Sequence, residues 1–185
     1  MSLEYAILGF LNYKPLSGYD LKKIFDTSVQ HFWPADQSQI YRTLTHLAEQ
    51  GWAEMEIVEQ SERPDRKVYH ITAAGREALR QWLLTPLRPH IPRNADLIQV
   101  FFAGQLSNEE ILAMFERAAA RLRVVLKVYE QIPQQVEEYH DYMDSPREFF
   151  CWMLTLEAGF KSAQANLAWL EDVIRRIKNG EMPER

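Results

Sequence analysis

Residues 36–51, DQSQIYRTLTHLAEQG, decide the fold of the first half of the chain. Apolar side chains recur in this stretch at the spacing of one helix face: Ile40, Leu44 and Leu47. This spacing predicts a helix with one buried face. Asp36 and Gln39 are spaced as in an N-terminal capping box, and Gly51 is typical of a helix end. The opposite face presents polar residues, namely Gln37, Ser38, Gln39, Tyr41, Arg42, Thr45 and His46.

Two shorter helices are predicted upstream of this one. Apolar residues at helical spacing indicate a helix over residues 2–12: Leu3, Ile7, Phe10 and Leu11. Ser17 and Asp20 then form the pattern of a second capping box. Leu21, Ile24 and Phe25 follow as the buried stripe of the next helix. The first 51 residues therefore predict three helices in succession.

The residue pattern changes downstream. Residues 52–59 and 67–71 are rich in β-branched and apolar residues, and the segment between them has turn chemistry around Pro64 and Asp65. Thr72 is placed to cap a fourth helix over residues 73–84. Three helices, a hairpin and a helix, in that order, are typical of a winged helix-turn-helix domain.

The outward face of residues 37–46 has side chains that suit DNA. Gln and Arg present donor and acceptor groups that match base edges, and Ser, Thr and Tyr hydroxyls suit phosphates. The hairpin tip adds three cations for the DNA backbone or minor groove: Arg63, Arg66 and Lys67. An ordinary solvated helix face beside a charged turn is the alternative interpretation.

Charge alone does not point to nucleic acid. The formal net charge of the chain is −5, and residues 1–86 carry 9 Lys and Arg against 11 Asp and Glu. DNA binding must therefore depend on where single charges lie. For such a domain we expect modest, strongly salt-dependent affinity.

A proline-rich stretch, residues 85–92, divides the chain. We predict a DNA-binding domain over residues 1–86, a linker over 87–93 and a helical dimerisation domain over 94–185. Ser107 with Glu110 and Ser145 with Glu148 are predicted capping boxes. The expected fold is thus mostly α (α+β), with long antiparallel coiled-coil helices in the second domain.

Two apolar stripes with alternating steps of four and three predict those long helices. The first consists of Ile111, Phe115, Ala118, Leu122, Val125, Tyr129 and Ile132. Such spacing is typical of a coiled coil. Because a thin helical hairpin leaves apolar surface over, we expect a second copy of the chain to cover it. The predicted dimer interface, on the second stripe, is Phe149, Met153, Leu156, Phe160, Leu167, Leu170 and Ile174.

Aromatic side chains in the second domain suggest a cavity for a small effector. Trp152 and Trp169 lie off the apolar stripe, and Phe101 and Phe102 form a further aromatic pair. Ordinary core packing is the alternative for all four. The single cysteine, Cys151, excludes an internal disulfide, and we expect it to be buried and inert rather than a redox sensor.

Several function classes are not favoured. No apolar run is long enough to cross a membrane, and no leader segment is visible, which predicts a cytoplasmic protein. We find no nucleophile–base pair, metal-ligand cluster or glycine-rich phosphate loop. The sequence therefore predicts a non-enzyme without a cofactor or metal.

The first 84 residues resemble the PadR-type transcriptional regulators. Three segments carry the resemblance: LEYAILGFL (3–11) with SGYDLK (17–22), WP (33–34) with SQIYRTL (38–44) and LAEQG (47–51), and KVYHIT (67–72) before Gly75. The second domain is similar to the long dimerisation domain of one PadR subfamily. The resemblance implies a homodimeric repressor on a pseudo-palindromic operator, released by a small, often phenolic or planar aromatic, molecule.

The resemblance also implies site residues by position. Ser38, Gln39, Tyr41 and Arg42 match the recognition helix, while Arg63, Arg66 and Lys67 fall in the wing. Ser17, Gly18, Tyr19 and Lys22 match the segment that supports that helix and touches the DNA backbone. The alternative function, which the net acidity leaves open, is a helical protein–protein interaction module whose winged domain no longer reads DNA.

Overall fold

The computed structural model describes residues 2–30, 32–59, 65–86, 93–135 and 145–183. The chain divides into two compact units, Met1–Arg88 and Pro89–Arg185. The linker predicted over residues 87–93 lies almost wholly outside the described residues, so the domain boundaries from the sequence stay a prediction.

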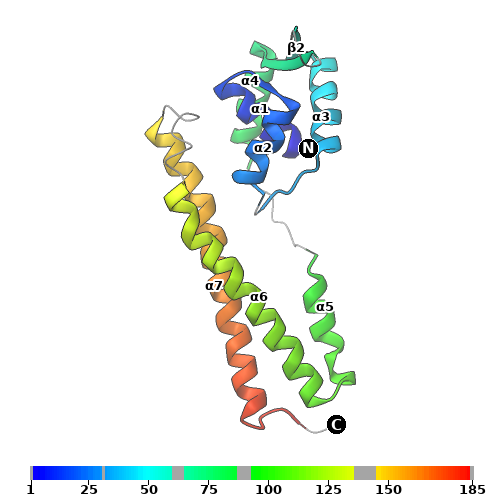
Figure 1. Cartoon of the computed structure of the whole chain (residues 1–185), viewed down its shortest axis with the longest axis vertical. Helices are drawn as coiled ribbons and strands as arrows, with labels where there is room; N and C mark the ends of the chain where they lie inside the picture. Colours follow the sequence, from blue (N-terminus) through cyan, green and yellow to red (C-terminus); the bar gives the residue numbers. More distant parts are fainter. Residues whose placement is uncertain (1, 31, 60–64, 87–92, 136–144, 184–185) are drawn as a thin grey trace. The chain divides into compact units, whose positions relative to one another are not determined.

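In its described residues, the first unit contains four helices and a small antiparallel sheet (Figure 1). Its elements are α1 (Ser2–Tyr13), β1 (Leu16–Ser17), α2 (Gly18–Thr27), α3 (Gln37–Glu49), β2 (Ala53–Val58), β3 (Arg66–Ile71) and α4 (Ala73–Leu84). The strand order is β1-β3-β2, with Ser17 opposite Val68 and Ala53 opposite Ile71. The predicted hairpin and its flanking helices are confirmed, whereas the two-residue strand β1 was not foreseen.

The core of this unit lies between the three N-terminal helices and one end of the sheet. Its fully buried side chains are Ile7, Leu8, Leu21, Phe25, Ile40, Leu44 and Leu47. They include the apolar stripe predicted for residues 36–51, so α3 turns that stripe inward. Tyr69 and Ile71 of β3 complete the cluster. Burial of these apolar surfaces is the main stabilising contribution to the unit.

Side-chain caps fix where the helices begin. Ser17 and Asp20 form a reciprocal capping box at α2, and Asp36 and Gln39 form another at α3. Both boxes were predicted from the sequence and are confirmed. After α3 the chain turns through Gly51, whose φ of +69° is the left-handed conformation that glycine adopts without strain.

The second unit is helical. It consists of α5 (Ala95–Phe102), the short 3₁₀ helix η1 (Ala103–Gln105), α6 (Asn108–Gln135) and α7 (Pro146–Lys178). The long helices α6 and α7 lie antiparallel along each other, as Figure 1 shows. Ile111 and Phe115 of α6 pack with Leu170 of α7, and α5 joins this cluster through Val100. The predicted mostly helical fold class is confirmed.

Two expectations about α7 are wrong. Ser145 begins the helix with Pro146 after it, but its side chain makes no capping hydrogen bond. The backbone carbonyl of Ser145 instead accepts the N–H of Glu148 at 3.0 Å. Cys151 was expected to be buried, yet it is exposed in the single chain, because its position faces away from the stripe that packs on α6.

Candidate nucleic-acid interface

The outward face of α3 is the centre of the candidate interface. All seven polar residues predicted for this face are exposed: Gln37, Ser38, Gln39, Tyr41, Arg42, Thr45 and His46. They are exposed because Ile40, Leu44 and Leu47 hold the other side of α3 in the core. The arrangement offers amide, hydroxyl and guanidinium groups along about two helical turns, which suits base edges and phosphates in a major groove.

The first turn of α3 is already occupied by its own cap. The Gln39 side-chain oxygen accepts the Asp36 backbone N–H at 3.0 Å, and the Ser38 hydroxyl donates to the Asp36 carboxylate at 2.9 Å. Hydrogen bonds from the Gln39 backbone and the Ser38 hydroxyl lower the pKa of Asp36. The start of α3 therefore carries a carboxylate, which disfavours a DNA phosphate at that helix end.

Tyr41 has a structural partner that the sequence did not reveal. Its ring lies so close to Gly18 that a Cβ at Gly18 would be 2.6 Å from the ring. Gly18 is buried at the start of α2, while Tyr41 remains 39% exposed. The ring thus sets the spacing between α2 and α3, with part of its surface still available to a ligand.

The wing strand β3 is joined to the start of α2 by an ion pair. The Arg66 guanidinium donates to the Asp20 carboxylate, although the two residues are 46 positions apart in the sequence. The same Asp20 oxygen accepts the Ser17 backbone N–H at 2.8 Å and the Ser17 hydroxyl at 2.6 Å. Arg66, predicted as a DNA-contacting cation, is therefore bound to a carboxylate in this structure.

The charge of Asp20 is maintained by these contacts. Burial acts to raise the pKa of Asp20, but the hydrogen bonds from Ser17 and from Arg66 outweigh it, and the net pKa is lowered. Asp20 is therefore ionised at neutral pH and retains its pairing with Arg66.

The remaining wing residues form a surface of mixed charge. Lys67 is exposed on β3. On the neighbouring strand β2, Glu54 and Glu56 are exposed, and Glu56 lies 2.8 Å from a ring nitrogen of His70. Arg63, the third predicted wing cation, lies outside the described residues. Acidic side chains thus lie close to the described wing cations, in keeping with the net acidity noted above.

The structure divides the remaining predicted DNA-binding residues into two groups. Ser17 and Gly18 are buried and support the helix pair. Tyr19 is exposed on α2, and Lys22 is partly exposed but paired with Asp26. The burial of Ser17 and Gly18 follows from the Tyr41 and Asp20 contacts, which join distant segments and which helix periodicity does not indicate. Direct contact of any of these residues with DNA stays a prediction.

The four effector candidates do not share one site. Trp169 contacts Phe115 edge to face at 5.7 Å and lines a hollow of about 510 Å³ beside α5. Trp152 lies 17 residues earlier on α7, about 25 Å along the helix axis. Phe101 and Phe102 pack edge to face on each other, with Phe101 81% exposed. Phe102 lines a different hollow, of about 630 Å³, between α5, η1 and the start of α6.

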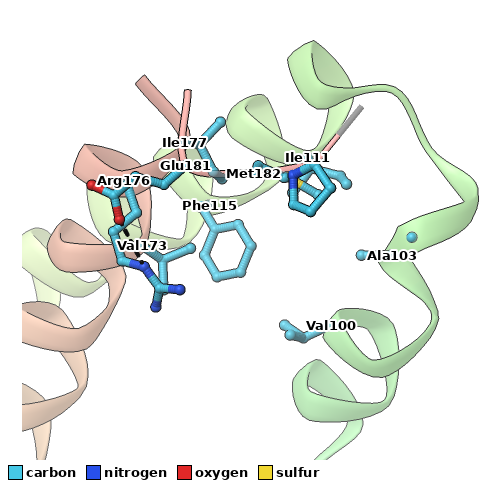
Figure 2. A pocket seen from close by; sticks show the side chains of 11 residues that line it. Val100, Ala103, Ile111, Phe115, Val173, Arg176, Ile177, Glu181 and Met182 are labelled. Atoms are coloured by element: carbon cyan, nitrogen blue, oxygen red, sulfur yellow. Dashed lines mark ion pairs between the residues drawn. The ribbon is translucent and has the colours of Figure 1, made fainter. Parts of the chain in front are cut away.

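A smaller hollow, about 250 Å³, lies where α5 and η1 meet the start of α6 and the end of α7. Figure 2 shows Phe115, Val100 and Ile111 around this space. Arg176 and Glu181 line it too, with the guanidinium Nε 3.4 Å from the carboxylate. Neither Arg176 nor Glu181 belongs to a motif that the sequence reveals.

The predicted dimer stripe packs largely within the chain. Leu156 and Leu170 are buried, and Leu167 and Ile174 pack partly against the cluster shared with α6. Phe149, Met153 and Phe160 are half-buried. Other apolar side chains of the second unit are exposed in the single chain: Leu97, Ile98, Phe101, Phe102, Val124, Val125, Val128, Phe150, Leu154 and Trp169. None of these exposed residues belongs to the predicted dimer stripe. Phe101, Phe102 and Trp169 are effector candidates, and Val125 lies on the predicted stripe of the first long helix.

None of the helices in the described part of the chain is both long and apolar enough to cross a membrane.

Two family models together match most of the chain. Residues 7–81 match the transcriptional regulator PadR-like family, and residues 92–178 match the C-terminal domain of the virulence activator alpha family. A probable transcriptional regulator of Mycobacterium tuberculosis is 29% identical, over 96% of this chain and 98% of that protein.

Solved structures agree with these matches over the full length. The structure of Bacillus subtilis PadR in complex with operator DNA is similar with a TM-score of 0.82 and 28% identity, covering 96% of this chain and 99% of that one. The same protein in complex with p-coumaric acid gives a TM-score of 0.77, with 27% identity and 95% of each chain covered. The Vibrio cholerae virulence activator AphA gives 0.72, with 26% identity, 96% of this chain and 98% of that one.

Both units, in the same order and at nearly full length, are thus those of a known group of regulators rather than of an enzyme. The chain belongs to the PadR-like family of transcriptional regulators.

Proposed function

We propose that the chain is a homodimeric repressor that binds a pseudo-palindromic operator through α3 and the wing and leaves it when a small phenolic acid binds. The observation that carries the DNA-binding part is the exposed polar face of α3, held outward by its buried apolar stripe. The relative in B. subtilis is named a negative transcriptional regulator, and its structure was solved with operator DNA.

The exposed apolar side chains of the second unit support the homodimer. Phe101 and Ile98 on α5 and Val128 on α6 are more than half exposed in the single chain. Apolar surface of this extent is typical of an interface. A two-fold dimer would place two α3 helices on two half-sites, about 34 Å apart on B-DNA. We therefore place the second copy on this surface as well as on the predicted stripe.

The proposed effector is a planar aromatic acid, as in the relative solved with p-coumaric acid. Within this chain we place such a molecule in the hollow beside Trp169 rather than in the one that Phe102 lines, because two aromatic side chains, Phe115 and Trp169, line the former. Its lining combines Phe115 and Leu122 with the Arg121 guanidinium, so an aromatic ring and a carboxylate both find suitable groups there. Such a regulator acts on the chromosome, so we place it in the cytoplasm.

The first experiment measures fluorescence anisotropy on labelled DNA from upstream of the protein's own gene, with excess generic DNA as competitor, at two salt concentrations. Arg42→Ala is compared with Arg80→Ala, which removes the same charge from the exposed face of α4. We expect salt-sensitive binding that survives the competitor and that Arg42→Ala weakens by about tenfold or more, since one good Arg–base contact is worth ~1–3 kcal/mol. Arg80→Ala is expected to bind nearly as the wild type does.

An absence of DNA binding at low salt would contradict the proposal and favour the protein–protein interaction module. Where binding is found, p-coumaric acid is added to the complex. We expect release of the DNA, with a higher acid concentration needed for Trp169→Phe than for Trp152→Phe. Equal release by both variants would exclude the Trp169 hollow as the effector site while leaving DNA binding intact.

A further inference from the structure

A side-chain contact joins the wing to α2 near the outer end of β3. Arg66 is the first residue of β3, and its guanidinium donates to Asp20 in the first turn of α2. Backbone pairing between β3 and β1 is only two residues long, Leu16 with Tyr69 and Ser17 with Val68. Tyr69 and Ile71 hold the inner end of β3 in the core. Because so short a strand as β1 contributes few hydrogen bonds, the ion pair adds a contact at the outer end of β3, where Arg66 lies.

Ser17 joins three parts of this contact. It is the last residue of β1, its hydroxyl accepts the Asp20 backbone N–H at 3.2 Å as the cap of α2, and it donates to the Asp20 carboxylate. One carboxylate oxygen of Asp20 therefore receives Ser17 N–H, Ser17 O–H and Arg66. The start of α2, strand β1 and the wing meet at a single atom.

The next residue extends this contact to α3. Gly18 follows Ser17 and lies against the ring of Tyr41, on the outward face of α3. A movement of Ser17 and Asp20 would thus change the position of both the wing and α3. Arg66, held in this way, presents only part of its guanidinium to solvent, with the side chain 46% exposed.

We propose that Asp20 is a positioning residue for DNA binding, which holds Arg66 and thereby fixes the wing relative to α2 and α3. The inference rests on the proposed function. The proposed role and the charge of Asp20 predict opposite effects on DNA affinity. An acidic side chain near a DNA-binding face repels phosphate, so neutralising it would strengthen binding if charge were its only effect. A positioning role requires that neutralisation weaken binding.

Asp20→Asn is the test, and Asp26→Asn is its matched control, since Asp26 lies on the same helix and is exposed. Affinity for the upstream DNA is measured across a series of salt concentrations. We expect Asp20→Asn to weaken binding about three- to tenfold, the range of a partly exposed, hydrogen-bonded ion pair. Asp26→Asn, which releases Lys22 from its pair, is expected to bind equally or more tightly.

Two further variants separate positioning from general loss of structure. If Asp20 acts through Arg66, Asp20→Asn in an Arg66→Ala background causes no further loss of affinity. In Asp20→Asn and in Arg66→Ala, the magnitude of the slope of log affinity against log salt concentration is expected to decrease by about 0.9, as for one lost phosphate contact. Asp20→Glu, which keeps the charge, restores part of the affinity. Thermal unfolding of each variant shows that the domain remains folded.

Hydrogen exchange of the free protein tests the positioning of the wing without DNA. Amide hydrogen exchange at Leu16 and Tyr69, which are paired across β1 and β3, is expected to be about threefold to tenfold faster in free Asp20→Asn than in free Asp26→Asn, because the β1–β3 pairing opens more often. Tighter DNA binding by Asp20→Asn, additive losses with Arg66→Ala, or unchanged exchange would each overturn the inference. Failure of the wild type to bind DNA would instead refute the proposed function, and unchanged exchange would then still reject the positioning of the wing.

Discussion

Gly18 occupies a position where a single methyl group has a measurable effect. An alanine Cβ there would lie 2.6 Å from Cε1 and 2.8 Å from Cζ of the Tyr41 ring, well inside van der Waals contact. We predict that Gly18→Ala lowers the free energy of unfolding by about 1–2 kcal/mol, since the ring must shift. Urea denaturation followed by circular dichroism measures this difference.

Gly9→Ala is the control for this prediction. Gly9 lies within α1, and a Cβ there meets nothing within 4 Å. Alanine has the higher helix propensity, so Gly9→Ala is expected to raise stability by about 0.5–1 kcal/mol. If Tyr41→Ala removes the penalty of Gly18→Ala, the ring is its cause. A penalty that persists in Tyr41→Ala would contradict the steric account.

Asp20 predicts how the stability of the first unit depends on pH. Its pKa in the folded protein lies below the ordinary value of 3.8, chiefly because hydrogen bonds from Ser17 and Arg66 outweigh the effect of burial. A lowered folded pKa stabilises the protein above pH 3.8, and this contribution is lost as the pH falls below 3.8 through the folded pKa. The difference in melting temperature between wild type and Asp20→Asn is therefore expected to be largest near pH 7 and to shrink below pH 3.8. A difference that grows in acid would contradict this pairing.

Single residues also show the limit of what the sequence predicts. Periodicity correctly placed Ile40, Leu44 and Leu47 inside and the polar face of α3 outside, because those patterns depend on neighbours three and four positions apart. The Arg66–Asp20 pair spans 46 positions. Its formation depends on the tertiary arrangement of β3 and α2, so the sequence indicated only that both residues were polar.

At the scale of elements, the cap of α4 joins the start of that helix to the turn that precedes β2. The Thr72 hydroxyl donates to the Gly51 carbonyl at 2.7 Å and accepts the Gly75 N–H at 3.0 Å. Thr72→Ala is predicted to destabilise the first unit by about 1–2 kcal/mol, because both hydrogen bonds are lost. Thr72→Ser retains the hydroxyl and should lose less than half as much in the same urea titration. Equal losses would mean that the methyl group, rather than the hydroxyl, carries the effect.

Helix starts were predictable where the cap is local and less so where the chain offers another solution. Ser107 and Glu110 exchange the predicted bonds, with the Ser107 N–H 2.8 Å from the Glu110 carboxylate. Ser145 and Glu148 have the same spacing, yet the helix starts with Pro146 and a backbone bond from Glu148 to Ser145. Proline favours the first helical position through its fixed φ, so the helix can begin there without the side-chain cap.

At the scale of the whole molecule, the sequence predicted a mixed unit followed by a helical one, but it could not divide the apolar residues of α7 between packing within the chain and a dimer interface. A 4–3 stripe shows that a helix has a partner but not which one. In α7 this stripe packs largely on α6 of the same chain, with Leu170 buried against Phe115. The apolar side chains left exposed by that pairing become evident only once the two helices are in place.

Phe101 provides the test of the assembly. Its ring is 81% exposed on α5 in the single chain, so Phe101→Glu would have little effect on a monomer. In the proposed dimer the same substitution places a charge in an apolar contact, and the dimer dissociation constant is expected to rise about tenfold or more, as for an interface residue worth at least 1–2 kcal/mol. Sedimentation equilibrium measures that constant. Gln105→Glu, which adds the same charge at an exposed polar residue of η1, should leave it unchanged. Operator affinity should decrease in Phe101→Glu because fewer dimers form, and two half-sites need α3 helices from two copies.

An unaltered dimer dissociation constant would mean that α5 lies outside the interface and that the second copy contacts the α6 and α7 residues instead.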